Sequence, residues 1–228
     1  MTNGLFITGT STNVGKTWVT AALTRLLRQR GIDAVALKPF CCGPRDDAEL
    51  LREASASVLS IEETNPVWFR APAAPYVAAM VEGRHVDIGL AMESVESARR
   101  RHELVLVEGA GGWRVPILRD FAVSDFAKSI CFPVAVVATN RLGVLNHTRL
   151  TLESIQQSRV QLFGTILNDA ESAPAENHED HLASLTNASI LEDLLGCPLL
   201  DHIPWNGTPE RLATLLIDQL HSTPPPSD

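Results

Sequence analysis

Apolar segments rich in β-branched residues recur along the chain, and each is followed by a polar turn. Most of them are continuously apolar rather than alternating, which is typical of strands covered on both faces. They span residues 5–8, 34–37, 104–107, 134–138, 162–167 and, more weakly, 199–203. Helical patterns lie between or after them, at residues 17–30, 88–101, 147–158 and 212–220. This order predicts an α/β fold with a mainly parallel sheet, right-handed crossovers and helices on both faces.

Length and composition narrow the classes of protein that fit. The 228 residues can bury one sizeable core. No linker or repeat divides the chain, which predicts one domain over residues 1–221 and a disordered tail at 222–228. A formal net charge of −8 disfavours nucleic acids and anionic membranes as partners. The sequence shows no secretory or transmembrane pattern, so we expect a cytoplasmic protein. The four cysteines lack the spacing of a zinc site, and we expect them to be reduced thiols.

The segment GTSTNVGKT, residues 9–17, separates the first predicted strand from the first long helix. Ligands of open parallel sheets bind beyond the carboxyl ends of the strands, where backbone N–H groups and a helix N-terminus can surround phosphate. Gly15 would let the backbone approach phosphates, Lys16 would supply charge, and the Thr17 hydroxyl could bind Mg²⁺. Counted from Gly9, the loop is one residue longer than G-x-x-x-x-G-K-[ST]. Its place between strand and helix predicts a P-loop that binds a nucleoside triphosphate.

Two carboxylates are placed to bind Mg²⁺ together with Thr17. Glu108 ends a predicted strand in VEGAGG, and a carboxylate that leaves a buried strand into a glycine-rich loop can reach a metal at the sheet edge. Asp47 is the second candidate, although either it or the adjacent Asp46 could instead cap a helix.

A second lysine, Lys38, ends the second predicted strand. The proline that follows prevents a helix from continuing there, so the side chain should project into the crevice that holds Lys16. Two lysines that converge on a phosphate site favour stabilisation of a transferring phosphoryl group.

Several motifs in this order and spacing resemble the dethiobiotin synthetase family. They are GTSTNVGKT, KPFCCG, DA at 47–48, NP at 65–66, VEGAGGWRVPI and RLGVLNH, and the resemblance runs from about residue 4 to about 212. It implies an ATP- and Mg²⁺-dependent ligase of biotin biosynthesis. Such an enzyme carboxylates one amine of 7,8-diaminopelargonic acid with CO₂ or bicarbonate, phosphorylates the carbamate and closes a cyclic urea, giving dethiobiotin, ADP and phosphate. It also implies a homodimer with the diamine site near the interface.

The resemblance further implies roles for individual residues. Lys38, Lys16 and Thr12 would be catalytic, with Lys38 stabilising the carbamate and its phosphorylated form. Thr17, Asp47 and Glu108 would hold Mg²⁺. The cofactor-binding set would also contain Asn13, Val14, Gly15, Lys16, Trp18, Gly109, Ala110, Gly111, Asn168, Asp169, Pro204, Trp205, Asn206 and Glu210. The diamine would contact Cys42, Gly143, Val144, Asn146 and His181, the last from a segment lent by the partner subunit.

Some of these roles have alternatives. Asn168 would read adenine through its amide, which offers both a donor and an acceptor. Pro204 and Trp205 would close over the base or only pack the sheet edge. The pair His178 and His181 could form a metal site, but nothing else joins them, and a solvated helix start is the preferred interpretation.

Four positions depart from the family pattern. Ser11 stands where aspartate is common, Asn13 where glutamate is common and Tyr76 where histidine is common, and Cys42 replaces a serine. Cysteine is a weaker hydrogen-bonding partner, so the site would hold the diamine less firmly or accept a somewhat different one. A further hypothesis gives Cys42 a lowered pKa and redox sensitivity beside the two lysines. A disulfide with the adjacent cysteine is disfavoured by the strain of vicinal pairs.

Two other functions stay open. A P-loop ligase or amidase that acts on a different amine or carboxylate would explain Cys42 and Asn13. A partitioning or scaffold ATPase that switches its dimerisation with nucleotide would also need a P-loop. Such proteins typically carry a second lysine inside the loop and a DNA- or membrane-binding surface, whereas residues 9–12 contain no lysine and the chain is acidic.

Overall fold

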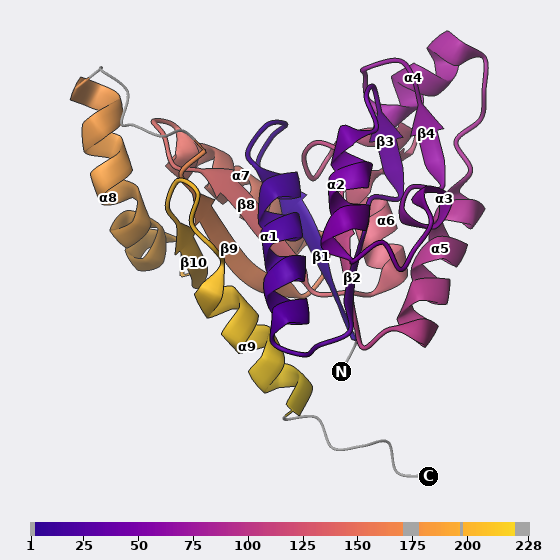
Figure 1. Ribbon diagram of the computed structural model, residues 1–228. Coiled ribbons are helices and arrows are strands. Elements are labelled where there is room, and N and C mark those ends of the chain that lie inside the picture. The colour runs from indigo at the N-terminus through magenta and orange to yellow at the C-terminus, as the bar shows by residue number, and fades with distance from the viewer. Residues whose placement is uncertain (1–2, 171–177, 197, 222–228) are drawn as a thin grey trace.

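Six parallel strands form the central sheet, in the order β10-β9-β8-β1-β5-β2 (Figure 1). The computed structural model describes residues 3–170, 178–196 and 198–221. The strands of this sheet are β1 (Gly4–Gly9), β2 (Ala34–Leu37), β5 (Leu104–Glu108), β8 (Val134–Thr139), β9 (Leu162–Asn168) and β10 (Leu199–Ile203). All neighbouring pairs are parallel. The predicted α/β fold with a parallel sheet is therefore confirmed, and each strand ends within one residue of its expected bounds.

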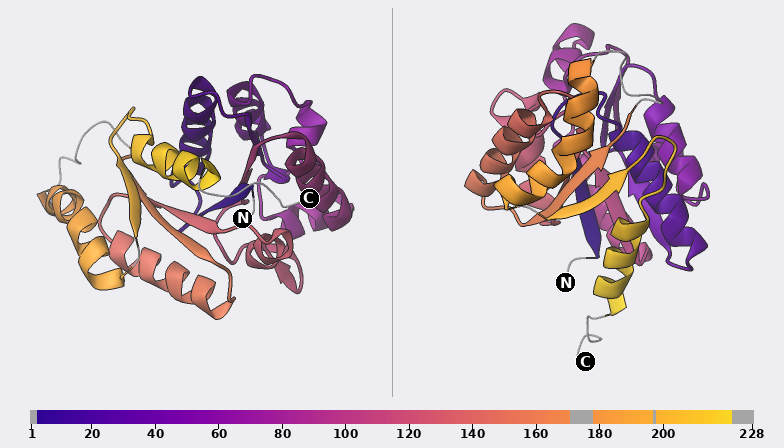
Figure 2. Two further views of the ribbon diagram at one scale, coloured as in Figure 1. Left: turned by 90° about the horizontal axis from the view of Figure 1, so that it is seen from below. Right: turned by 90° about the vertical axis from the view of Figure 1, so that its left-hand side faces the viewer.

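Helices cover both faces of the sheet (Figure 2). One face carries α1 (Lys16–Gln29), α2 (Asp46–Ala54) and α9 (Glu210–His221), and the other carries α5 (Ile88–Arg101), α6 (Val123–Ile130) and α7 (Val144–Gln157). Successive side chains of a strand point to opposite faces of the sheet, so β1 contributes to the core on both faces. Leu5 and Ile7 pack in the cluster with α1, whereas Phe6 packs in the cluster with α6. This two-sided burial explains the continuous apolar runs of the sequence.

The expected helices correspond to α1, α5, α7 and α9, whose ends differ from the expected bounds by three residues at most. The remaining long helix, α8 (His178–Leu195), packs beside α7 at the β10 end of the sheet. Among the described residues, no helix combines the length and the apolar character that crossing a bilayer requires. Residues 222–228, predicted as a disordered tail, lie outside the described residues.

Short elements that the sequence patterns do not predict lie beyond the carboxyl ends of the strands. They are the parallel pair β3 (Phe40–Cys42) and β4 (Val67–Phe69), the antiparallel pair β6 (Pro116–Leu118) and β7 (Phe121–Ala122), and the helices α3 (Ile61–Thr64) and α4 (Pro75–Glu82). Strands of two or three residues are too short to show a periodic pattern. In Figure 1, β3, β4 and α4 rise at the upper right, above the end of β2.

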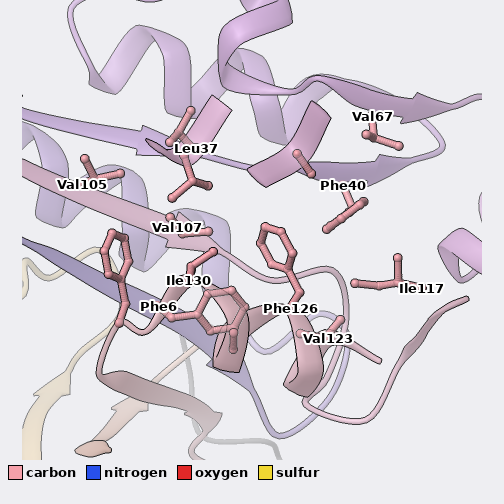
Figure 3. Packing of buried hydrophobic residues seen from close by; sticks show 14 of the residues in the cluster. Phe6, Leu37, Phe40, Val67, Val105, Val107, Ile117, Val123, Phe126 and Ile130 are labelled. Atoms are coloured by element: carbon pink, nitrogen blue, oxygen red, sulfur yellow. The ribbon is translucent and has the colours of Figure 1, made fainter. Parts of the chain in front are cut away.

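Aromatic packing anchors β3 to the core (Figure 3). The ring of Phe126, from α6, lies 5.0 Å from the ring of Phe40 in an edge-on arrangement and 6.5 Å from the ring of Phe6, measured between centroids. Such pairs contribute about 0.5–1.5 kcal/mol beyond the burial of their area. The core therefore fixes the segment that connects Lys38 with Cys42.

Candidate active site

The predicted P-loop connects β1 to α1 at the carboxyl edge of the sheet. Gly15 has a φ of +89°, a left-handed conformation that glycine adopts without strain. A Cβ at this position would overlap the side-chain nitrogen of Asn168, which donates to the Val14 carbonyl oxygen at 3.1 Å. Gly15 is therefore required by its own backbone and by the close approach of the end of β9.

Lys38 lies directly after β2 and joins the two carboxylates predicted to bind magnesium. Its Nζ donates to Asp47 Oδ2 at 2.6 Å and to Glu108 Oε1 at 2.6 Å. Thr17 Oγ1 also donates to Glu108 Oε1, at 2.9 Å. Glu108 ends β5, and Asp47 lies in the first turn of α2 after Arg45, which is the N-cap residue in place of either aspartate. The ends of β2 and β5 and the starts of α1 and α2 thus meet around one ammonium group.

The two lysines differ in their electrostatic surroundings. Burial by itself lowers the pKa of Lys38, but the charges of Glu108 and Asp47 outweigh burial and raise this pKa above its usual value. For Lys16, burial is the largest influence and lowers the pKa, although Glu108 opposes it. Lys16 Nζ folds back onto the loop and donates to the Ser11 carbonyl oxygen at 3.2 Å. Lys38 is thus a firmly protonated group between two carboxylates, and Lys16 lies beside the loop itself.

The chemistry of Glu108 fits a divalent cation. Its side chain is buried, and its Oε2 has no hydrogen-bond partner within the described residues. A buried carboxylate oxygen is costly to leave unsatisfied, and Mg²⁺ is commonly held by one or two carboxylates together with other oxygen ligands. Asp47 and the Thr17 hydroxyl supply such oxygens. The described residues contain no group of three or more His, Cys, Asp or Glu side chains that could hold a metal.

These groups line a cleft of about 660 Å³. On the side of β3 and α4 its walls are mainly apolar and include Phe40, Cys42, residues 72–75 and Val115. On the opposite side of β1, the cleft is lined by Ala170, which follows β9, and Trp18 lines it from the first turn of α1. In the sheet, β1, which leads into the P-loop, lies between β9 on one side and β2, which leads into Lys38 and β3, on the other.

The cleft gathers a large part of the predicted site. It is lined by Thr12, Asn13, Gly15, Lys16, Thr17, Trp18, Lys38, Cys42, Asp47, Glu108, Ala110 and Gly111. Other described candidates lie outside this lining: Val14, Gly109, Gly143, Val144, Asn146, Asn168, Asp169, Pro204, Trp205, Asn206 and Glu210. The side chains of His178 and His181 lie outside the described part of the structure.

Sequence reasoning missed the apolar wall of the cleft. Phe40, residues 72–75 and Val115 have no chemical signature of their own, although the two prolines in RAPAAP mark a rigid turn that could have drawn attention.

Two acidic candidates for the nucleotide site have other partners. Asp169 Oδ1 accepts from Asn140 Nδ2 at 2.8 Å and lies 3.0 Å from His202 Nε2. Glu210 forms an ion pair with Arg30, at the end of α1. These contacts link the ends of neighbouring elements, and a role in nucleotide binding stays a prediction for both residues.

Cys42 is not the activated thiol that its neighbouring lysines suggested. Burial is the largest influence on it, and together with Cys41 it raises the pKa of Cys42 to about 12, against a weaker opposing effect of Lys38. The hypothesis of a lowered pKa is therefore wrong, because loss of hydration outweighs the nearby positive charge. Cys41 and Cys42 are both free thiols.

At pH 8, Cys42 is expected to react with iodoacetamide much more slowly than the exposed Cys131. A pKa of about 12 leaves a thiolate fraction roughly a thousand-fold below that of an ordinary cysteine, and the thiolate is the nucleophile. Peptide mass mapping after timed labelling measures both sites in one sample. Equal labelling rates at the two cysteines would contradict the expectation.

Solved structures with a similar fold include a cell division protein and an ATPase. The MinD cell division protein of Aquifex aeolicus has a TM-score of 0.57 and 15% identity, and the match covers 98% of this chain and 99% of that chain. A ParA family ATPase from Chlorobium tepidum has a TM-score of 0.55 and 12% identity, with coverage of 98% and 100%. At such identities the likeness shows the fold alone.

Sequence comparison is more specific. A family model described as "AAA domain" matches residues 3–211. The ATP-dependent dethiobiotin synthetase of Akkermansia muciniphila is 38% identical over 94% of this chain and 98% of its own length. The enzyme of the same name from Anaeromyxobacter dehalogenans is 40% identical, with coverage of 93% and 95%. With this identity over nearly the whole length of both partners, the chain belongs to the family of ATP-dependent dethiobiotin synthetases.

Proposed function

We propose that the protein uses ATP and Mg²⁺ to form dethiobiotin from 7,8-diaminopelargonate and CO₂ or bicarbonate, as a soluble cytoplasmic enzyme of biotin biosynthesis. Relatives that carry this enzyme's name support the proposal over nearly the full length of the chain. The observation that carries it is the convergence of Lys38, Glu108 and Thr17 at the P-loop cleft. This arrangement suits a reaction in which two anions must meet.

The reaction requires charge neutralisation more than proton transfer. One amine of the diamine adds to CO₂ and loses a proton, which gives a carbamate. A carbamate oxygen then attacks the γ-phosphorus of ATP, and ADP leaves. The second amine attacks the carbamoyl carbon, loses a proton and displaces phosphate, which closes the ring. Because the carbamate and the γ-phosphate are both anionic, cations between them lower the barrier to their approach.

The two lysines would neutralise charge on different reactants. Lys38 is buried, lines the cleft and stays protonated beside its two carboxylates, so its ammonium can bind the carbamate oxygens. Lys16 stands at the start of α1, where backbone N–H groups and the helix dipole favour the phosphates of ATP. Thr12 lines the same cleft from the preceding part of the loop. Positioning and fixed charge would then supply most of the rate.

Thr17, Asp47 and Glu108 would hold Mg²⁺, with the unpartnered Glu108 Oε2 as one available oxygen. Bound there, the metal would neutralise charge on the β- and γ-phosphates. Glu108 already orients the Thr17 hydroxyl through their hydrogen bond.

The apolar side of the cleft suits the alkyl chain of the diamine. Phe40, residues 72–75 and Val115 provide the wall, and Phe40 is held by the core through Phe126. Cys42 stands in this wall, where the family pattern has serine. Its nearly equal size preserves the shape of the site while weakening a hydrogen bond.

Trp18→Ala is expected to weaken ATP binding about ten-fold, because stacking of a base on an aromatic ring contributes roughly 1–3 kcal/mol. Trp18 is 42% exposed and lines the cleft from the first turn of α1, directly after the P-loop. Calorimetric titration with ADP measures the effect. Trp205→Ala tests the competing prediction that Trp205 closes over the base, since this residue is 48% exposed but does not line the cleft. A larger loss for Trp205→Ala would place the base elsewhere.

A homodimer would complete the site. Gly143 and Asn146, predicted to bind the distant carboxylate of the diamine, are exposed at the start of α7 and do not line the cleft of their own chain. A second copy could present this helix N-terminus, and the segment with His181, to the open end of the cleft. Light scattering at micromolar concentration is expected to give twice the monomer mass of 24.8 kDa, whereas a monomer would contradict this part of the proposal.

The direct test is the stoichiometry of turnover. We expect ADP release to require both the diamine and bicarbonate, with one ADP formed per dethiobiotin. Release of ADP at the same rate without the diamine would instead favour a ligase for another substrate or a nucleotide-switched ATPase.

A further inference from the structure

We propose that Asn65 is a positioning residue for Lys38 and, through Arg45, for the first turn of α2 that carries Asp47. The inference rests on the proposed function, because it concerns the geometry of the groups assigned to that reaction. Asn65 stands in the NP motif at the end of α3, and its side chain is fully buried.

Every polar atom of the Asn65 side chain has a partner. Its Nδ2 donates to the carbonyl oxygens of Lys38 at 2.8 Å and of Val67 at 3.1 Å. Its Oδ1 accepts from Arg45 Nε at 2.9 Å, and its backbone oxygen accepts from Arg45 Nη2 at 2.8 Å. An amide is suited to this task because it can donate to two carbonyls and accept from a guanidinium at once.

These contacts close a ring through the site. Asn65 holds the backbone of Lys38 and the side chain of Arg45, Arg45 begins α2, and Lys38 Nζ reaches back to Asp47 at 2.6 Å. The Lys38 N–H is also held by the Thr64 carbonyl oxygen at 2.8 Å. Both peptide groups of the catalytic lysine are therefore fixed by the short segment that ends α3. The P-loop takes no part in this ring.

Asn65→Asp replaces the donor with an oxygen that faces two carbonyls and leaves the acceptor for Arg45. We expect kcat for dethiobiotin formation to fall about a hundred-fold, since small displacements of reacting groups cost this much, while the Kd for ADP changes less than two-fold. Asn3→Asp is the matched control. Asn3 Nδ2 also donates to two carbonyls, those of Arg99 and His102, at the opposite edge of the sheet, so its loss should leave kcat unchanged.

An unchanged kcat in Asn65→Asp, or an equal loss of ADP affinity, would overturn the positioning role. Arg45→Met is a second variant that keeps the bond between Asn65 and Lys38. We expect it to lower kcat about ten-fold and to raise the Mg²⁺ concentration needed for half-maximal rate. An Arg45→Met enzyme with unaltered Mg²⁺ dependence would overturn the link to α2. A wild-type protein that makes no dethiobiotin would instead refute the proposed function.

The Lys38 ammonium occupies the space between Asp47 and Glu108, the two carboxylates that are predicted to bind the metal. The geometry points to competition between Lys38 Nζ and a divalent metal for Asp47 and Glu108, so that the ammonium leaves them when the metal binds. This second inference rests on the proposed metal site. It is carried by the two short bonds of Lys38 and by the unpartnered Glu108 Oε2, which are independent of Asn65.

One ammonium is shared by two carboxylates, of which Glu108 has a completely buried side chain. A divalent cation at the same oxygens would match their charge more fully but would repel an ammonium only a few ångströms away. Lys38 lines the cleft, so its released side chain stays where the carbamate and the γ-phosphate would arrive. Binding of the metal would thus also free the Lys38 ammonium to contact the carbamate and the γ-phosphate.

The competition predicts that loss of Lys38 strengthens metal binding. With Mn²⁺ alone as the probe, and free Mn²⁺ measured by electron paramagnetic resonance, Lys38→Met should bind about ten-fold more tightly than wild type. Lys38→Arg, which keeps a cation, should not show this gain, and Lys128→Met on the remote helix α6 should match wild type. Equal or weaker Mn²⁺ binding by Lys38→Met would overturn the inference, and neither outcome depends on ring closure.

A measurement on the wild-type protein removes any dependence on how the variants fold. The chain has only three lysines, Lys16, Lys38 and Lys128, so a spectrum of ¹³Cε-labelled lysine is readily assigned. Addition of Mg²⁺ to the protein already saturated with ADP should shift the Lys38 signal and leave that of Lys128 in place. A Lys38 signal that does not respond to Mg²⁺ would contradict the exchange.

Discussion

Lys38→Met is expected to lower the rate of dethiobiotin formation about a thousand-fold, which is the size of effect seen when a charged group that stabilises a transition state is removed. Methionine keeps much of the lysine volume but carries no charge. Lys38 Nζ donates its hydrogen bonds to Asp47 and Glu108 rather than to a residue of the P-loop, so the affinity for ADP should change little. Steady-state kinetics and calorimetric titration with ADP measure the two quantities separately.

The same substitution leaves Glu108 buried without its cation, and breaking a buried pair costs about 3–5 kcal/mol of stability. Lys38→Met combined with Glu108→Gln removes both charges. We expect this double variant to recover most of the lost unfolding free energy in denaturant titrations but none of the lost rate. A double variant that closes the ring at the wild-type rate would refute the catalytic role of Lys38.

Gly15→Ala is expected to lower ring closure at least a hundred-fold by abolishing tight nucleotide binding. The left-handed backbone alone costs an alanine about 1–2 kcal/mol, and the added Cβ would also overlap the Asn168 amide. Relief of this overlap must break the hydrogen bond from Asn168 to the Val14 carbonyl or move the loop. Both changes distort the cradle that would hold the phosphates. Calorimetric titration with ADP and turnover assays measure the loss.

Gly31→Ala separates the effect of the left-handed backbone from the effect of the overlap with Asn168. Gly31 has a φ of +86°, close to that of Gly15, but a Cβ there meets nothing within 4 Å, and the residue lies beyond the far end of α1. It should therefore lose a similar amount of stability from the backbone and retain full activity. If Gly15→Ala behaved like Gly31→Ala in both assays, the contact with Asn168 would have no functional importance.

Much of the fold and the centre of the site could be predicted from the sequence, because their signals are local. Two-sided burial leaves continuous apolar runs, which mark all six strands of the sheet. The P-loop residues are adjacent in the chain. Lys38 and Glu108 could be assigned because they end strands whose carboxyl ends share one edge of a parallel sheet.

What the sequence could not supply are contacts between distant segments. Nothing local to Asn168 indicates that its amide crosses Gly15 to reach Val14, 154 positions away. The pKa of Cys42 depends on burial in a cleft wall built partly from residues 72–75. The neighbouring lysines alone therefore led to the wrong direction for its shift. The role argued for Asn65 likewise needs Lys38 and Arg45 to be placed in space.

We propose that the Lys38 ammonium and a divalent metal at Glu108 together allow a carbamate to meet a terminal phosphoryl group. A crystal structure of the wild-type protein with Mg²⁺, a non-hydrolysable ATP analogue, the diamine and bicarbonate would show whether these groups meet in the cleft. We expect Lys38 Nζ to lie within hydrogen-bonding distance of the carbamate and Mg²⁺ to be bound by Glu108. A diamine bound away from this cleft, or a lysine turned away from the γ-phosphate, would contradict it.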